Sequence, residues 1–267
     1  MLAKELGESE EAGTEAAKAI MTTDTRNKQA AVKVTIGGKE VTVGGMCKGS
    51  GMIHPNMCTM LAFVTTDVNI SQKLLQEALS EDVQSTFNMI SVDGDTSTND
   101  TLLVLANGEA KNAEITEKNE DYRIFAEALH FVNEALAKKI AGDGEGATAL
   151  FEAKVVHADT LENARTLAKS VITSSLTKAA IFGHDANWGR ILCALEKIEL
   201  YLESSVGKIL IFKDGTAADY SEEEAERILS SAEVTAFVDM KMGDAEATAW
   251  GCDLTYDYVK INADYRS

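Results

Sequence analysis

The sequence has 267 residues, of which 45% are hydrophobic and 25% charged, which is enough for one large domain or two smaller ones. Its formal net charge of −18 repels phosphate backbones and anionic lipid, and no basic stripe with interleaved aromatic residues offsets that charge. No stretch approaches the roughly 18 to 20 apolar residues of a membrane span, and the acidic N-terminus has no apolar core of a signal peptide. We therefore expect a cytoplasmic protein with neither nucleic acid nor membrane as a partner.

The predicted elements of the first part of the chain surround one glycine-rich loop. Residues 1–20 favour a short acidic helix, and alternating apolar residues on both sides of Gly37-Gly38 predict a β-hairpin. Residues 44–58 hold four glycines and the only proline of the chain, so they predict a loop. An apolar run at 60–64 follows at once and predicts a buried strand.

Helices and strands then follow each other without a regular β-α-β rhythm, and this predicts a layered α+β fold. Helices are expected at about 71–79, 119–140, 161–172 and 222–231, and strands at about 102–105, 151–156, 209–212, 234–240 and 247–255. Ser221 and Glu224 form a capping box at the start of the last helix. The chain becomes richer in strands towards its C-terminus, from about residue 200.

The common cofactor and metal motifs are absent. The sequence contains no phosphate-binding loop, no H-E-x-x-H and no G-x-S-x-G, and its four histidines share no metal-ligand spacing. The four cysteines, Cys47, Cys58, Cys193 and Cys252, form no C-x-x-C pair, so we expect free thiols in a reducing compartment. No metal site and no bound cofactor are therefore expected.

Thr59 lies between the glycine-rich loop and the predicted buried strand. A threonine hydroxyl is a weak nucleophile unless a base lies beside it. A cut before Thr59 would give it an α-amino group with a pKa of about 7.7–8, which could take the hydroxyl proton. Periodicity cannot establish such a cut, and from the residues alone a threonine with no catalytic role remains the alternative.

The stretch GGMCKGSGMIHPNMCTMLAFVTTD (44–67) resembles the self-processing segment of the bifunctional ornithine acetyltransferase/N-acetylglutamate synthase family. The resemblance continues through Met21–Thr25, through SVDGDTSTNDT (91–101) and FGHDANWGRILCA (182–194), and to AWGCDLTYDYVKINADYRS (249–267). It implies a layered sandwich of the ornithine acetyltransferase/aminopeptidase type, similar to N-terminal-nucleophile folds.

The resemblance also implies a reaction. The precursor would cut itself between Cys58 and Thr59, although the family usually has alanine before the threonine. The resulting chains, 1–58 (α) and 59–267 (β), would assemble as a heterotetramer with two copies of each. Thr59 would then carry an acetyl group from N2-acetyl-L-ornithine to L-glutamate, a step of arginine biosynthesis. Acetyl-CoA would be a co-substrate only in bifunctional members, and neither metal nor bound cofactor is implied.

By resemblance, the substrate-binding residues beside Thr59 are Thr22 (or the adjacent Thr23), Lys48, Glu145, Asn262 and the terminal Ser267. Lys48 can pair with a substrate carboxylate and Glu145 with an amino group of ornithine. Asn262 and Ser267 can supply neutral hydrogen bonds. From the residues alone, the alternatives are a lysine that is only exposed to solvent and a glutamate that only makes its loop hydrophilic. Residues 93–101 and 185–190 are expected to give structural support more than catalysis.

One departure from the family leaves the activity open. Only 58 residues precede Thr59, whereas family members have a longer front segment that includes the Thr-Gly pair of the oxyanion hole. A truncated sequence, a fragment, or a front segment supplied by another chain would explain this. Two alternatives to the acetyltransferase follow: an N-terminal-nucleophile amidase or aminopeptidase whose acyl-enzyme reacts with water, and an inactive remnant.

Overall fold

The computed structural model describes residues 7–56, 59–191 and 198–264. The chain forms two compact units, which we describe separately. The first unit comprises Met1–Asn88 and Thr96–Ile140, and the second comprises Met89–Asp95 and Ala141–Ser267. None of the described helices is long and apolar enough to cross a membrane.

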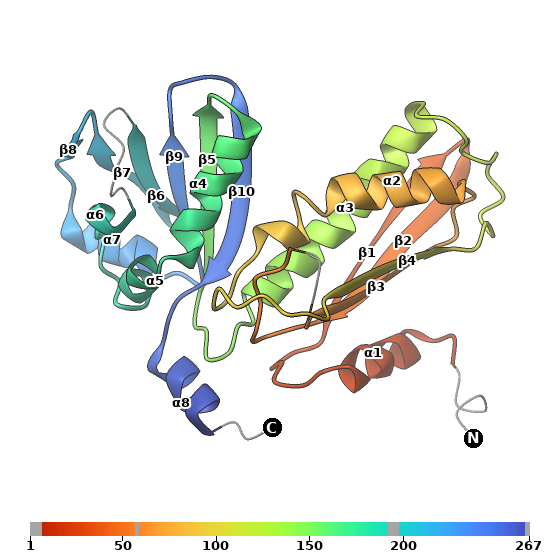
Figure 1. Cartoon of the computed structure of the whole chain (residues 1–267), viewed down its shortest axis with the longest axis horizontal. Coiled ribbons are helices and arrows are strands. Elements are labelled where there is room, and N and C mark those ends of the chain that lie inside the picture. Colours follow the sequence, from red (N-terminus) through yellow and green to blue (C-terminus); the bar gives the residue numbers. More distant parts are fainter. Residues whose placement is uncertain (1–6, 57–58, 192–197, 265–267) are drawn as a thin grey trace. The chain divides into compact units, whose positions relative to one another are not determined.

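The first unit contains a four-stranded sheet with the strand order β1-β2-β3-β4 (Figure 1). Its strands are β1 (Lys28–Ile36), β2 (Lys39–Lys48), β3 (Leu61–Thr66) and β4 (Thr101–Ala106). β1, β2 and β3 pair antiparallel in turn, whereas β3 and β4 are parallel. Gly37 and Gly38 turn the predicted hairpin with positive φ angles of 55° and 73°, which only glycine adopts at no steric cost. The predicted hairpin and buried strand are thus confirmed.

The predicted loop at 44–58 is wrong at its start, because β2 continues to Lys48. Six residues of β2, from Val43 to Lys48, pair with β3, so strand pairing overrides the low strand preference of the glycines. Gly45 is required there for another reason: a Cβ at this position would lie 3.0 Å from a Val64 methyl group and 3.1 Å from a Leu136 methyl group. The glycine lets helix α3 (Glu120–Ala141) approach the sheet closely.

Helices cover both faces of this sheet. The helices are α1 (Glu10–Ala19), α2 (Gln72–Asp82) and α3 (Glu120–Ala141), with a short 3-10 helix at Phe87–Met89. α2 and α3 lie over one face and α1 over the other (Figure 1). The face of α3 predicted to be apolar is fully buried at Phe125, Leu129 and Leu136. Ser71 caps α2 as predicted, with its hydroxyl accepting from the Leu74 N–H.

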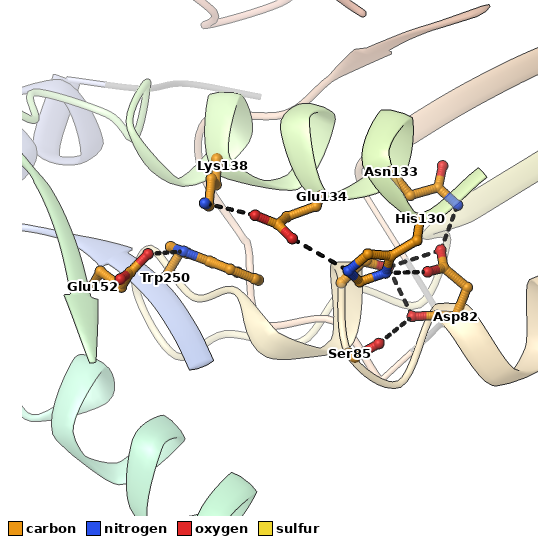
Figure 2. A network of polar contacts seen from close by, with 9 residues as sticks. Asp82, Ser85, His130, Asn133, Glu134, Lys138, Glu152 and Trp250 are labelled. Carbon is orange, nitrogen blue, oxygen red and sulfur yellow. Dashed lines mark hydrogen bonds and ion pairs between the residues drawn. The ribbon is translucent and has the colours of Figure 1, made fainter. Parts of the chain in front are cut away.

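A polar network joins α2 to α3 (Figure 2). The buried Asp82 carboxylate accepts from Asn133 Nδ2 at 2.7 Å and pairs with His130 Nδ1 at 2.6 Å. His130 Nε2 lies 3.2 Å from Glu134, which also pairs with Lys138 at 2.6 Å. The bond to Asp82, then that to Glu134, raises the pKa of His130 to about 10. The bond from His130, with help from Lys138, lowers the pKa of Glu134 to about 2.

The second unit contains a six-stranded sheet with the order β10-β5-β9-β6-β7-β8. Its strands are β5 (Leu150–Ala158), β6 (Glu199–Ser204), β7 (Gly207–Lys213), β8 (Thr216–Ala217), β9 (Glu233–Asp239) and β10 (Ala245–Cys252). Its helices are α4 (Leu161–Thr173), α5 (Ser175–Phe182), α6 (Trp188–Ile191), α7 (Glu222–Leu229) and α8 (Tyr256–Asp264). α4 packs on β5 and β10, and α7 on β6 and β7. Ser221 caps α7 as predicted.

The α+β class is confirmed, but β6, α5 and α8 were not predicted individually. α8 buries no residue, and its sequence has no clear apolar stripe. The periodic signal that predicts a helix is therefore missing there. In the second unit, which comprises Met89–Asp95 and Ala141–Ser267, β5 lies between β10 and β9 in the sheet. A separate β-rich subdomain from about residue 200 stays a prediction. The division at Cys58–Thr59 concerns a covalent bond, which the compact units do not test, and it stays a prediction.

Candidate active site

Thr59 lies two residues before β3, at the edge of the first sheet where that strand begins. Its hydroxyl donates a hydrogen bond to Ser97 Oγ, and Met52 Sδ lies 3.3 Å from the same Thr59 oxygen. The Ser97 side chain is buried, and its oxygen also accepts from the Asn99 N–H at 3.1 Å. The candidate nucleophile is therefore held by a second hydroxyl group.

Ser97 reaches Thr59 because β3 and β4 are parallel. Leu61 lies opposite Thr101 in their register, so the residues preceding the two strands meet at one edge of the sheet. The Met60 N–H donates to Asp100 Oδ1 at 3.0 Å, and the Thr101 N–H donates to the Met60 carbonyl at 3.0 Å. The segment before β4 is thereby fastened to the backbone next to Thr59.

Asp100 is the most unusual charged group of this segment. Its Oδ2 atom is buried and has no hydrogen-bond partner among the described residues. Burial raises the pKa of this carboxyl, while the Met60 N–H and the charge of Lys48 act in the opposite direction. A carboxylate near a lysine and next to a candidate nucleophile is an arrangement often found in active sites.

Sequence reasoning assigned residues 93–101 to structural support and did not single out Ser97 or Asp100. One signal could have found them. Two apolar runs, each preceded by hydroxyl-bearing residues, become neighbours if the strands are parallel, and the hydroxyl groups then meet at one edge. The sequence alone did not establish that the two strands were parallel neighbours.

Lys48 and Thr22 lie at the same end of the sheet. Lys48 ends β2 and lies opposite Leu61, two residues from Thr59, because β2 and β3 are antiparallel. Its side chain is buried, and its Nζ lies 3.4 Å from the exposed Thr22 hydroxyl. The structure therefore brings three of the predicted residues, Thr22, Lys48 and Thr59, to one edge.

A buried ion pair fixes the loops that carry Thr22 and Lys48. Asp24 Oδ1 accepts from Lys28 Nζ at 2.6 Å and from the Gly49 N–H at 2.7 Å, while Oδ2 accepts from the Thr22 N–H at 3.1 Å. Both side chains of the pair are fully buried. Burial alone would raise the pKa of Asp24, but the hydrogen bonds from Gly49, Lys28 and Thr22 outweigh it and lower that pKa.

Glu145 and Asn262 meet in the second unit. Asn262, on α8, donates its amide to Glu145 Oε2 at 2.8 Å and to the Tyr258 carbonyl at 3.0 Å. The loop of Glu145 packs on the start of α8, where Gly146 leaves no room for a Cβ and its carbonyl accepts from Thr255 Oγ1. Burial and neighbouring carboxylates raise the pKa of Tyr258 to about 12. These contacts place two predicted residues side by side.

Two predicted site residues, Cys58 and Ser267, lie outside the described residues. Thr23 is half-buried beside Thr22. The segment 185–190 has contacts that fit a supporting role: Arg190 Nη1 donates to the Leu176 carbonyl and Tyr220 donates to the Ala186 carbonyl. Within the described part of the chain, no group of three or more His, Cys, Asp or Glu residues could hold a metal ion.

A family model described as "ArgJ family" matches residues 1–267. The chain belongs to the ArgJ family. It is 49% identical over 268 residues to the arginine biosynthesis bifunctional protein ArgJ of Caldanaerobacter subterraneus subsp. tengcongensis and 53% identical to that of Symbiobacterium thermophilum. Each alignment covers 97% of this chain and 66% of the relative. The Bacillus subtilis ArgJ is 50% identical, with 94% of this chain and 63% of the relative covered.

A solved ArgJ-family structure supports the fold. The crystal structure of the arginine biosynthesis bifunctional protein ArgJ from Bacillus halodurans is 45% identical and superposes with a TM-score of 0.72. The match covers 76% of this chain and 98% of that one. The chain thus spans 63–66% of the length of these curated ArgJ relatives while it covers nearly all of one crystallised ArgJ chain.

Proposed function

We propose that this protein is an acetyltransferase of arginine biosynthesis that moves the acetyl group of N2-acetyl-L-ornithine to L-glutamate through an acetyl-Thr59 intermediate. The observation that carries the proposal is the position of Thr59. Its hydroxyl is bonded to Ser97, and it lies two residues before Leu61, the residue opposite Lys48 in the strand register. Family membership supports it, since the relatives are named arginine biosynthesis bifunctional proteins.

The chemistry begins with self-cleavage of the Cys58–Thr59 bond, which frees the α-amino group of Thr59. That amine takes the hydroxyl proton as Thr59 Oγ attacks the acetyl carbonyl of acetylornithine. Ornithine leaves with the proton, and an acetyl ester on Thr59 remains. The amino group of glutamate then attacks this ester, which gives N-acetylglutamate and restores the free hydroxyl.

Recognition of both substrates rests on charge. Acetylornithine and glutamate each carry an α-carboxylate, which Lys48 binds, with Thr22 as a neighbouring hydrogen-bond donor. Glu145 pairs with the side-chain ammonium of ornithine. Both amide hydrogens of Asn262 are used by Glu145 and Tyr258, so Asn262 orients the Glu145 carboxylate. The C-terminal Ser267 hydroxyl would complete this set.

The remaining expectations belong to the same proposal. The protein acts in the cytoplasm without metal or bound cofactor, and acetyl-CoA is a co-substrate if it is bifunctional like its named relatives. The α chain (1–58) and β chain (59–267) assemble as a heterotetramer.

The proposal is tested first by the intact mass of the purified protein. We expect a fragment of residues 59–267 that begins with Thr59, and we expect Thr59→Ala to remain a single uncut chain without acetyl transfer. Thr59→Ser keeps a hydroxyl and should still be cut. Formation of N-acetylglutamate is then measured with acetylornithine and glutamate, and release of free acetate is measured with and without glutamate. Equal release of free acetate in both reactions would contradict the transferase and favour the hydrolase.

A further inference from the structure

We propose that Ser97 is a catalytic residue of self-cleavage, which carries the proton of the Thr59 hydroxyl before the α-amino group of Thr59 exists. The inference rests on the proposed function, because it concerns the step that prepares the nucleophile. It deepens that function by assigning a role to a residue of the 91–101 loop.

The step needs a group that the mature enzyme does not require. In the uncut chain the Thr59 nitrogen belongs to the Cys58–Thr59 peptide bond, and an amide nitrogen is not a base. The hydroxyl of Thr59 must therefore lose its proton to another group when it attacks the Cys58 carbonyl carbon. Among the described residues, the Ser97 hydroxyl is an oxygen that accepts a hydrogen bond from Thr59 Oγ1.

The geometry of Ser97 suits a proton relay. Its oxygen accepts from the Thr59 hydroxyl and from the Asn99 N–H, so both acceptor positions are used and its own proton is left to donate. Its side chain is only 3% exposed, so bulk water does not compete for these bonds. Met52 Sδ, at 3.3 Å from Thr59 Oγ1, is a weak acceptor and cannot replace it.

The proton and bond changes balance. The C–O bond between Cys58 and Thr59 Oγ forms, and the Cys58–Thr59 C–N bond breaks. Ser97 receives the Thr59 hydroxyl proton and gives its own to the departing nitrogen, which becomes the α-amine. Water then hydrolyses the ester, which yields the Cys58 carboxylate and restores the Thr59 hydroxyl. No oxidant, reductant or metal enters the step.

Asp100 fixes the backbone on the C-terminal side of Thr59. Its Oδ1 accepts from the N–H of Met60, the residue directly after Thr59, while Thr101 binds the Met60 carbonyl. The two bonds fix the backbone so that Thr59 and Ser97 stay in contact. Ser97 and Asp100 thus have separate roles, because Ser97 moves the proton and Asp100 fixes the chain that carries the nucleophile.

The experiment follows the appearance of the 59–267 fragment by intact mass, in full-length wild type, Ser97→Ala, Ser97→Thr and the control Thr98→Ala. Thr98 is an exposed neighbour in the same loop. We expect Ser97→Ala to slow cleavage about 10²-fold, the lower end for the loss of a general acid–base group. Ser97→Thr, which keeps a hydroxyl, should restore most of the rate, and Thr98→Ala should match wild type.

A second measurement separates proton transfer from mere structural support. The fraction of Ser97→Ala that has been cut is assayed for acetyl transfer per cut chain. By then the α-amine is present, so we expect turnover to fall much less than the cleavage rate. Equal losses in cleavage and turnover, or a lowered melting temperature that accounts for both, would overturn the role of Ser97.

The remaining outcomes separate this inference from the proposed function. Cleavage of Ser97→Ala at the wild-type rate would overturn the inference and leave the acetyltransferase intact. Normal cleavage of wild type without acetyl transfer would overturn the acetyltransferase, and the role of Ser97 would then be decided by the cleavage rates alone. A wild-type chain that stays uncut would overturn both.

Discussion

Asp24 is a single side chain on which two predicted substrate-binding residues depend. Its two oxygens hold the backbone at Thr22 and at Gly49, the residue after Lys48, and its charge is balanced by Lys28. A buried ion pair of this kind adds little to stability compared with a well-packed apolar pair, but it is costly to break from one side. The main effect of this ion pair is to fix the backbone next to Thr22 and Lys48.

Asp24→Asn should therefore destabilise the first unit, because it removes the carboxylate charge that balances the buried Lys28 ammonium. We expect the free energy of unfolding to fall by about 3–5 kcal/mol in urea titrations. Glu15→Gln breaks an exposed pair with Lys18 and should change little. The double variant Asp24→Asn/Lys28→Met should recover part of the loss, and an unchanged midpoint for Asp24→Asn would refute this account.

Lys48 is expected to bind the substrate carboxylate. Lys48→Met should lower kcat/KM for acetylornithine by about 10- to 100-fold, since a hydrogen bond to a charged group contributes about 1.5–3 kcal/mol. Self-cleavage needs no substrate carboxylate, so the 59–267 fragment should still form, and this serves as the internal control. A normal kcat/KM in the cut variant would remove Lys48 from the substrate site.

At the scale of elements, the network between α2 and α3 predicts a pH dependence. The pKa of His130 is raised, so protonated His130 stabilises the folded state fully below its unfolded pKa of about 6.5. That contribution is lost as the pH rises through about 10. The stability difference between wild type and His130→Gln should thus be largest near pH 6 and shrink steadily towards pH 10.

Urea unfolding at pH 6, 8 and 10 measures this difference. Glu134→Gln removes the second partner of His130 and should move the loss of stability to lower pH. Glu134 has the opposite pH dependence, because its pKa is lowered. Ionised Glu134 stabilises the fold fully above about pH 4.3, and this stabilisation is lost as the pH falls through about 2. A difference that stays constant from pH 6 to pH 10 would exclude His130 as the titrating group.

The elements also show what sequence reasoning can reach. The hairpin, α3 and the two hydroxyl caps could be predicted because periodicity, glycine pairs and capping residues are local signals. The end of β2 could not, since pairing with β3 decided whether Gly44–Lys48 were strand or loop. Thr59, Lys48 and Thr22 were named from resemblance, whereas Ser97 depended on the parallel pairing of β3 with β4, which no local pattern encodes.

At the scale of the whole molecule, the predicted cut would fall inside one sheet. Residues before it supply α1, β1 and β2, and residues after it supply β3 and β4. β2 and β3 pair through six residues across the cut. Cleavage should therefore leave the two fragments bound to each other.

We expect both fragments to elute together in native size-exclusion chromatography and to separate only in denaturant. Intact mass under denaturing conditions identifies the two pieces, and the uncut Thr59→Ala chain provides the elution reference. Separate elution under native conditions would show that strand pairing is too weak to hold them.

The pairing of β2 with β3 has a consequence for the reaction order of refolding. The uncut chain forms this pair within one molecule, at a rate that does not depend on protein concentration. Once the peptide bond is cut, the same pair forms only when two molecules meet, so refolding becomes second order and slows on dilution. A protein of this kind would assemble easily once, as a precursor, and would regain its sheet slowly after any later unfolding.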